Sequence, residues 1–222
     1  GPYHEYKLQS HGYEFIVWLR SENSEDSEDV ELAQRFLQIS PKYLSDYEKM
    51  LGTYPYTKFI LVENFLQTGF GLPAMTLLGN QVIRLPFILN SSYPHEILHN
   101  WWGNGVFVHY ESGNWCEGLT TYLADHRLQG ENLVQSSSEY RRTALNDYTQ
   151  FAKGDLDFPL ADFRARHSSS SQAVGYGKAM MVFHMLRQNI GDELFLEGLR
   201  KFYRDFLYKE ASWQDIEVTF SQ

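Results

Sequence analysis

Two histidines four residues apart, His95 and His99, constrain this chain more than any other feature. Residues at positions i and i+4 of a helix lie on one face, so both imidazoles can reach the same metal ion. A second predicted helix follows and carries Glu117 in the segment Asn114 to Gly118. The spacing therefore predicts two neighbouring helical segments that share one metal.

Zinc is the metal that imidazole and carboxylate ligands of this kind most often bind, at about 2.0–2.1 Å. A set of His95, His99 and Glu117 leaves the fourth position open for water, which is typical of a catalytic zinc ion. Glu96 would lie beside the metal and accept a proton from the activated water. A His-Glu-x-x-His string occurs by chance in about one chain in a hundred, but Glu117 on the next helix favours a zinc site.

Strand patterns come first in the chain and helical patterns later, which favours an α+β fold rather than alternating α/β. Runs of β-branched and aromatic residues predict strands over 13–19, 57–64, 74–78 and 81–89. Periodicity, capping residues and glycines predict helices over 28–39, 40–52, 92–102, 114–129, 132–152, 175–189 and 192–208, with a last helix beginning at Ser212. We expect one catalytic domain over 3–222, with a β-rich part over 3–91 and a helical zinc-binding part over 92–222.

Composition excludes several classes of function. The 222 residues carry a formal net charge of −9 and no long Lys/Arg cluster, so a nucleic-acid partner is not expected. No apolar run approaches the length of a membrane span. Gly1-Pro2 resembles a tag scar, and the chain ends inside a predicted helix, so we expect a fragment of a longer protein. An exported or periplasmic location is slightly favoured over a cytoplasmic one.

Residues from about 57 to 208 resemble the gluzincin metallopeptidases, most closely the catalytic domain of the aminopeptidase N and leukotriene hydrolase family. The matching segments are His95 to Asn104, Trp115 to Tyr122, Gly175 to Ala179, Ile190 to Glu193 and Phe195 to Leu199. The resemblance implies a thermolysin-like zincin fold with one Zn²⁺ held by His95, His99 and Glu117. It also implies that Glu96 is the general base and that Tyr176 donates to the transition-state oxyanion.

The sequence departs from that family at two places near the site. Seventeen residues separate His99 from Glu117, one fewer than usual, and we expect the connecting loop over 103–113 to absorb the deletion. Aminopeptidases of the family carry a Gly-X-Met-Glu-Asn string whose glutamate binds the free amino terminus of the substrate. The corresponding stretch, Thr68 to Met75, has no acid, and the nearest one is Glu63.

The sequence thus predicts a zinc-dependent, aminopeptidase-like peptidase that acts on peptide substrates through a metal-activated water. Two alternatives stay open. One is a thermolysin-like endopeptidase that needs no free amino terminus. The other is a non-catalytic, zinc-bearing domain that binds peptides. The sequence leaves the oligomeric state open.

Overall fold

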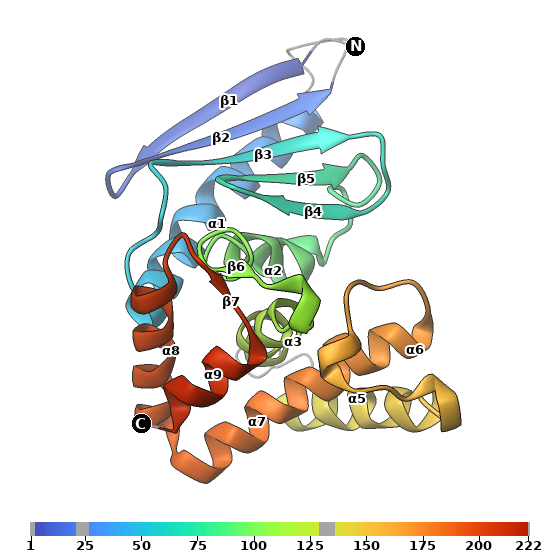
Figure 1. Ribbon diagram of the computed structural model, residues 1–222. Helices are drawn as coiled ribbons and strands as arrows, with labels where there is room; N and C mark the ends of the chain where they lie inside the picture. Colours follow the sequence, from blue (N-terminus) through green and yellow to red (C-terminus); the bar gives the residue numbers. More distant parts are fainter. Residues whose placement is uncertain (1–2, 21–26, 129–135, 222) are drawn as a thin grey trace. The chain divides into compact units, whose positions relative to one another are not determined.

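A computed structural model describes residues 3–20, 27–128 and 136–221 of the chain (Figure 1). The chain divides into two compact units, Gly1–Asn104 and Gly105–Gln222. The expected single catalytic domain over 3–222 stays a prediction, and the tag scar at Gly1-Pro2 lies outside the described residues. Among the helices of the described ranges, none combines the length and apolarity that crossing a membrane requires.

The first unit is built on a mixed five-stranded sheet in the order β1-β2-β3-β5-β4. Its strands are β1 (Tyr3–Ser10), β2 (Tyr13–Arg20), β3 (Lys58–Asn64), β4 (Gly69–Leu72) and β5 (Met75–Gly79). β2, β3 and β5 run parallel, while β1 and β4 pair antiparallel to their neighbours at the two edges. β3 is buried over Phe59–Asn64 because it lies in the centre of the sheet. The predicted α+β class with a mixed sheet is confirmed.

Helix α1 (Ser27–Leu51) packs beside β1 and β2 (Figure 1). The prediction of two helices with a cap at Ser40 was wrong, because one helix continues through Pro41. The Ser40 hydroxyl is bonded to the Phe36 carbonyl and to the Tyr93 hydroxyl, so it does not cap a new helix. The loss of one backbone bond at the proline is offset by burial of the following turns, where Tyr43 and Tyr47 anchor the helix.

The predicted strand over 81–89 was also wrong. That segment forms turns followed by a short 3-10 helix, η1 (Ile88–Asn90). The Ile83 amide donates to the Gly79 carbonyl at 2.8 Å, and Pro86 has no amide to offer a sheet. The sheet instead gains β1 and β4, which the sequence did not predict.

Helix α2 (Ser92–Leu98) carries the first half of the predicted metal motif and ends four residues before the expected boundary at 102. His99 is its C-cap residue, with helical backbone angles. Turns after His99 bury Trp101, whose indole donates to the Gly52 carbonyl at 2.9 Å. The burial of Trp101 and this hydrogen bond therefore anchor the turns after α2 in the core of the first unit.

The second unit is mainly helical. Its helices are α3 (Cys116–Thr121), α5 (Ser137–Phe151), α6 (Ser169–Gln172), α7 (Ala179–Ile190), α8 (Asp192–Phe206) and α9 (Trp213–Phe220). Two π-helical stretches, η3 (Tyr122–His126) and η6 (Ala173–Lys178), continue α3 and link α6 to α7. The remaining elements are the 3-10 turns η2 (Tyr110–Ser112), η4 (Gly154–Leu156) and η5 (Leu160–Asp162) and the parallel pair β6 (Phe107–Val108) and β7 (Glu210–Ala211).

Local signals explain several of these boundaries. A capping box of Ser136 with Glu139 begins α5, and another of Ser212 with Asp215 begins α9, as expected for the last helix. The parts of the predicted helices over 114–129 and 132–152 that fall on residues 129–135 lie outside the described residues. The buried Trp115 indole donates to the Ala211 carbonyl at 2.7 Å, which fixes the start of α3 in this core.

Candidate active site

Helix α2 presents His95 and His99 side by side. Their ring centroids are 4.8 Å apart and the rings are nearly perpendicular. The Nδ1 atom of His99 lies 3.1 Å from the Trp102 carbonyl oxygen. A hydrogen bond from Nδ1–H to that carbonyl fixes the tautomer and leaves Nε2 with its lone pair for a metal.

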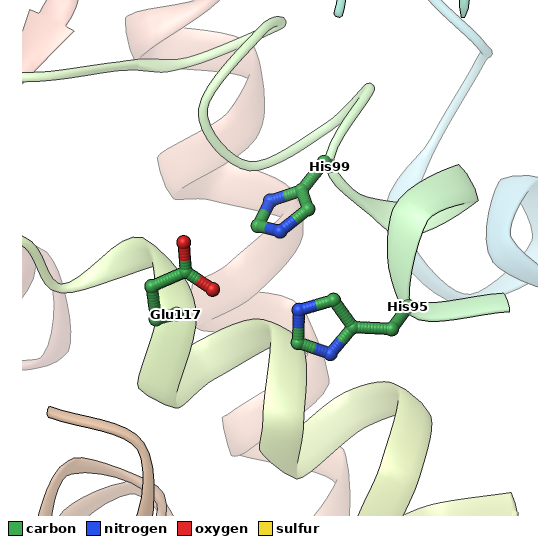
Figure 2. A group of neighbouring side chains, drawn as sticks. All are labelled: His95, His99 and Glu117. Atoms are coloured by element: carbon green, nitrogen blue, oxygen red, sulfur yellow. The ribbon is translucent and has the colours of Figure 1, made fainter. Parts of the chain in front are cut away.

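Glu117, on the first turn of α3, completes a group of potential metal ligands. One ligand atom from each of His95, His99 and Glu117 lies within 4.8 Å of the other two. Figure 2 shows both imidazoles and the carboxylate pointing toward one another. The three side chains converge although the segment joining them is one residue shorter than expected.

The donor set suits zinc. Two imidazoles and one carboxylate are a ligand set of catalytic zinc sites, in which water takes the fourth position. Bonds of about 2.0–2.1 Å require the ligand atoms to lie somewhat closer together than 4.8 Å. His99 and Glu117 are half-buried, and His95 is buried.

Glu96 lies in α2 between the two histidines and is half-buried. Strand β4 passes close to Glu96 and to His99, and a side chain at Gly69 or Gly71 would displace one of them. A Cβ at Gly69 would meet Glu96 Oε1 at 2.5 Å, and a Cβ at Gly71 would meet His99 Cβ at 2.9 Å. The Gly-x-Gly alternation was the only sign of this contact in the sequence, and that pattern is more often found in loops.

Tyr176 lies in η6, and its ring contacts that of Phe163. Burial raises the pKa of Tyr176 far above its usual value, and the neighbouring Glu117 carboxylate raises it further through its charge and a hydrogen bond. The hydroxyl is therefore protonated at neutral pH and lies next to the third candidate ligand. Both residues belong to the second unit.

The position of Glu117 depends on close packing between α3 and α7. Gly118 lies against Ala179, and a Cβ on Gly118 would come within 3.1 Å of the Ala179 backbone. Before the helix, Asn114 Oδ1 accepts a bond from the Cys116 amide at 3.1 Å. Cys116 itself is buried in the core of the unit and is not part of a disulfide bond.

Glu63, the acid nearest to the Thr68–Met75 stretch, is buried and forms an ion pair with the partly exposed Arg84. Its carboxylate is 2.6 Å from Arg84 Nη1 and accepts a bond from the Arg20 amide at 2.8 Å. Arg84 also contacts Asp29 at 2.8 Å. Glu63 therefore stabilises the first unit and does not face α2 as a free carboxylate.

The sequence missed Asn100 as a positioning residue. It is fully buried, its Oδ1 accepts from the Ala74 amide at 2.9 Å, and its Nδ2 donates to the Ile97 carbonyl at 2.8 Å. The side chain thus ties the end of α2 to the turn between β4 and β5. Its place directly after His99 was the only sign of this role in the sequence.

Comparisons with curated proteins give the chain's relatives. Aminopeptidase 2, mitochondrial, of Saccharomyces cerevisiae is 24% identical over 206 residues, which cover 80% of this chain and 20% of that protein. Leukotriene A-4 hydrolase of Xenopus laevis is 27% identical over 191 residues, covering 78% of this chain and 30% of the hydrolase. The chain therefore spans between a fifth and a third of the length of these relatives.

Solved structures share the fold. An M1 zinc metallopeptidase from Deinococcus radiodurans superposes with a TM-score of 0.69 at 17% identity, covering 99% of this chain and 48% of the other. Native LTA4 hydrolase from yeast gives the same TM-score and identity over 97% of this chain and 35% of the hydrolase. Residues 89–222, more than half of the chain, match the peptidase family M1 domain, and the chain belongs to that family.

Proposed function

We propose that this chain is the catalytic part of a zinc-dependent, aminopeptidase-like peptidase that hydrolyses peptide bonds. The observation that carries the proposal is the convergence of His95, His99 and Glu117, with Glu96 between the two histidines. Membership of peptidase family M1 implies zinc. We assign one ion to these three ligands.

Each residue then has a separate chemical task. The bound zinc ion supplies Lewis acidity for the water and for the peptide carbonyl. Glu96 takes a proton from the attacking water and delivers it to the nitrogen of the leaving amine as the C–N bond breaks. Tyr176, protonated at neutral pH, donates its hydroxyl to the carbonyl oxygen as negative charge develops there.

The test is Glu96→Gln, which keeps the size of the side chain and removes its basicity. We expect the variant to retain one equivalent of zinc by elemental analysis and to lose peptide hydrolysis by several orders of magnitude. Undiminished cleavage would exclude this mechanism. Stoichiometric zinc in the unmodified chain without cleavage of any peptide in a mixed library would favour the non-catalytic, peptide-binding alternative.

A second candidate is an enzyme that needs no free amino terminus, as a thermolysin-like endopeptidase does. Two observations favour it. Strand β4 places glycine, not an acid, against Glu96 and His99, and Glu63 is held by Arg84. Matched peptides with free and acetylated amino termini separate the candidates, because equal kcat/KM values would exclude an aminopeptidase.

A further inference from the structure

A cavity of about 250 Å³ opens within the second unit beside Tyr176. One wall is formed by α6 and η6, and the opposite wall by α5, which lies along η6 (Figure 1). Pockets for whole small molecules are usually about 300–1,000 Å³ in volume. This cavity therefore suits a single long side chain better than a larger ligand.

Helix α5 lines the cavity and contributes no buried residue to the core of the unit. None of its residues is buried, although a 15-residue helix of this kind normally buries an apolar stripe. The residues that it turns to the cavity follow helical spacing: Tyr140, Thr143, Ala144, Asp147 and Phe151. This face of α5 therefore lines the cavity while it packs only partly against η6.

The cavity contains one formal charge, that of Asp147. Within the described ranges, no lysine or arginine lies within ion-pair distance of this carboxylate. Hydroxyl groups and small apolar side chains form much of the remaining wall, including Thr143, Ala144 and Ala173. Such a surface accommodates a methylene chain and offers an acceptor to a cation.

A second observation indicates that a polar ligand enters. The Thr121 side chain is 4% exposed and lines the cavity, and its hydroxyl has no hydrogen-bond partner among the described residues. A buried hydroxyl without a partner is destabilising. A substrate atom or a water carried with it would supply the missing bond.

We infer that this cavity is a specificity pocket for a basic side chain, lysine or arginine, next to the scissile bond, with Asp147 as the residue that selects the charge. This inference rests on the proposed peptidase function, which places Tyr176 at the scissile carbonyl. The methylene stem lies along Ala144 and Phe151, and the cationic end reaches Asp147. Because Asp147 is exposed, we expect an effect nearer that of a surface ion pair than that of a buried one.

The test compares substrates that differ only in charge. Peptides carry lysine or its uncharged analogue norleucine at one of the two residues flanking the scissile bond, and kcat/KM is measured for each. We expect a preference for lysine of about two- to fivefold at one position. Asp147→Asn should lower kcat/KM for the lysine peptides and so abolish the preference. Asp155→Asn, an exposed acid outside the cavity, is the charge-matched control and should keep the preference.

A binding measurement separates failure of the pocket from failure of the proposed function. Calorimetry on the zinc-loaded Glu96→Gln variant, with and without Asp147→Asn, measures affinity for the same peptides without turnover. Tighter binding of lysine peptides that Asp147→Asn removes supports the pocket, even if the chain hydrolyses nothing. Active enzyme whose ratio of lysine to norleucine is unchanged by Asp147→Asn would overturn it.

Discussion

Gly69 lies directly over Glu96, so close that a Cβ added to the glycine would stand 2.5 Å from the Glu96 Oε1 atom. The two residues lie far apart in the sequence, and they meet because edge strand β4 passes beside α2 in the first unit. The backbone of β4 therefore limits where the proposed general base can place its carboxylate. The constraint at Gly69 comes from this close approach and not from an unusual backbone angle.

Gly69→Ala should consequently lower the activity without removing the metal. The added methyl group displaces the Glu96 carboxylate, and a misplacement of about 1 Å costs about 100-fold in rate. We expect kcat/KM to fall at least about tenfold while zinc content stays at one equivalent. Leu72→Ala changes an exposed side chain of the same strand and is the control. Full activity in Gly69→Ala would show that β4 does not position Glu96.

Tyr176→Phe tests the proposed oxyanion donor. Loss of one such donor typically lowers kcat by about 10²–10³. Because the hydroxyl acts on the transition state, KM and zinc content should change little. Tyr148→Phe, which removes a hydroxyl bonded to Asp157 at 2.8 Å, should keep nearly full activity. A rise in KM with unchanged kcat would instead assign Tyr176 to substrate binding.

Helical periodicity in the sequence was enough to place His95, Glu96 and His99 on one helix, because their spacing is local. Glu117 was found as an acid on the next predicted helix, but Tyr176 required the family resemblance, since nothing in local spacing brings it to another segment. Strand β4 was missed for a related reason. Gly69 and Gly71 have poor strand propensity, and the contact that requires them is with α2, more than twenty residues away.

The two wrong elements have the same physical origin. Ser40-Pro41 has the form of a helix start, but bonds from Ser40, Tyr43 and Tyr47 to distant segments keep α1 continuous. Apolar residues over 81–89 resemble a strand. In the structure, however, Arg84 forms ion pairs with Glu63 and Asp29, and backbone amides of this segment form hydrogen bonds within turns. Tertiary contacts override local propensity at both places.

Gly118→Ala should destabilise the second unit and disturb Glu117. Its Cβ would overlap Ala179 of α7, and such overpacking usually costs about 1–3 kcal/mol. For a chain of this size the melting temperature should fall by about 2–12 °C, as measured by calorimetry. Ala179→Gly in the same chain removes the overlap and should restore part of the loss. If the stability changes of the two single variants simply add in the double variant, Gly118 and Ala179 do not interact and this explanation is wrong.

His126 should make the stability of the second unit depend on pH. It is 6% exposed, stacks on Tyr122 and lies beside His184. Arg141 Nη1 lies 2.7 Å from its Nε2, which therefore accepts the bond as a neutral imidazole. Burial, then the Arg141 charge and His184, lower the pKa of His126 from 6.5 to about 4.

In the unfolded chain His126 regains a pKa near 6.5, so between about pH 6.5 and 4 the unfolded state holds a proton that the folded state lacks. Stability contributed by neutral His126 is complete above pH 6.5 and falls as the pH is lowered toward 4. At pH 5 the loss relative to pH 7.5 is about 2 kcal/mol, from about 1.4 kcal/mol per pH unit. Urea unfolding at both pH values should show this loss in the unmodified chain and a smaller one in His126→Gln. His167→Gln, at an exposed position, should behave as the unmodified chain. An equal loss in His126→Gln would assign the pH dependence to other groups.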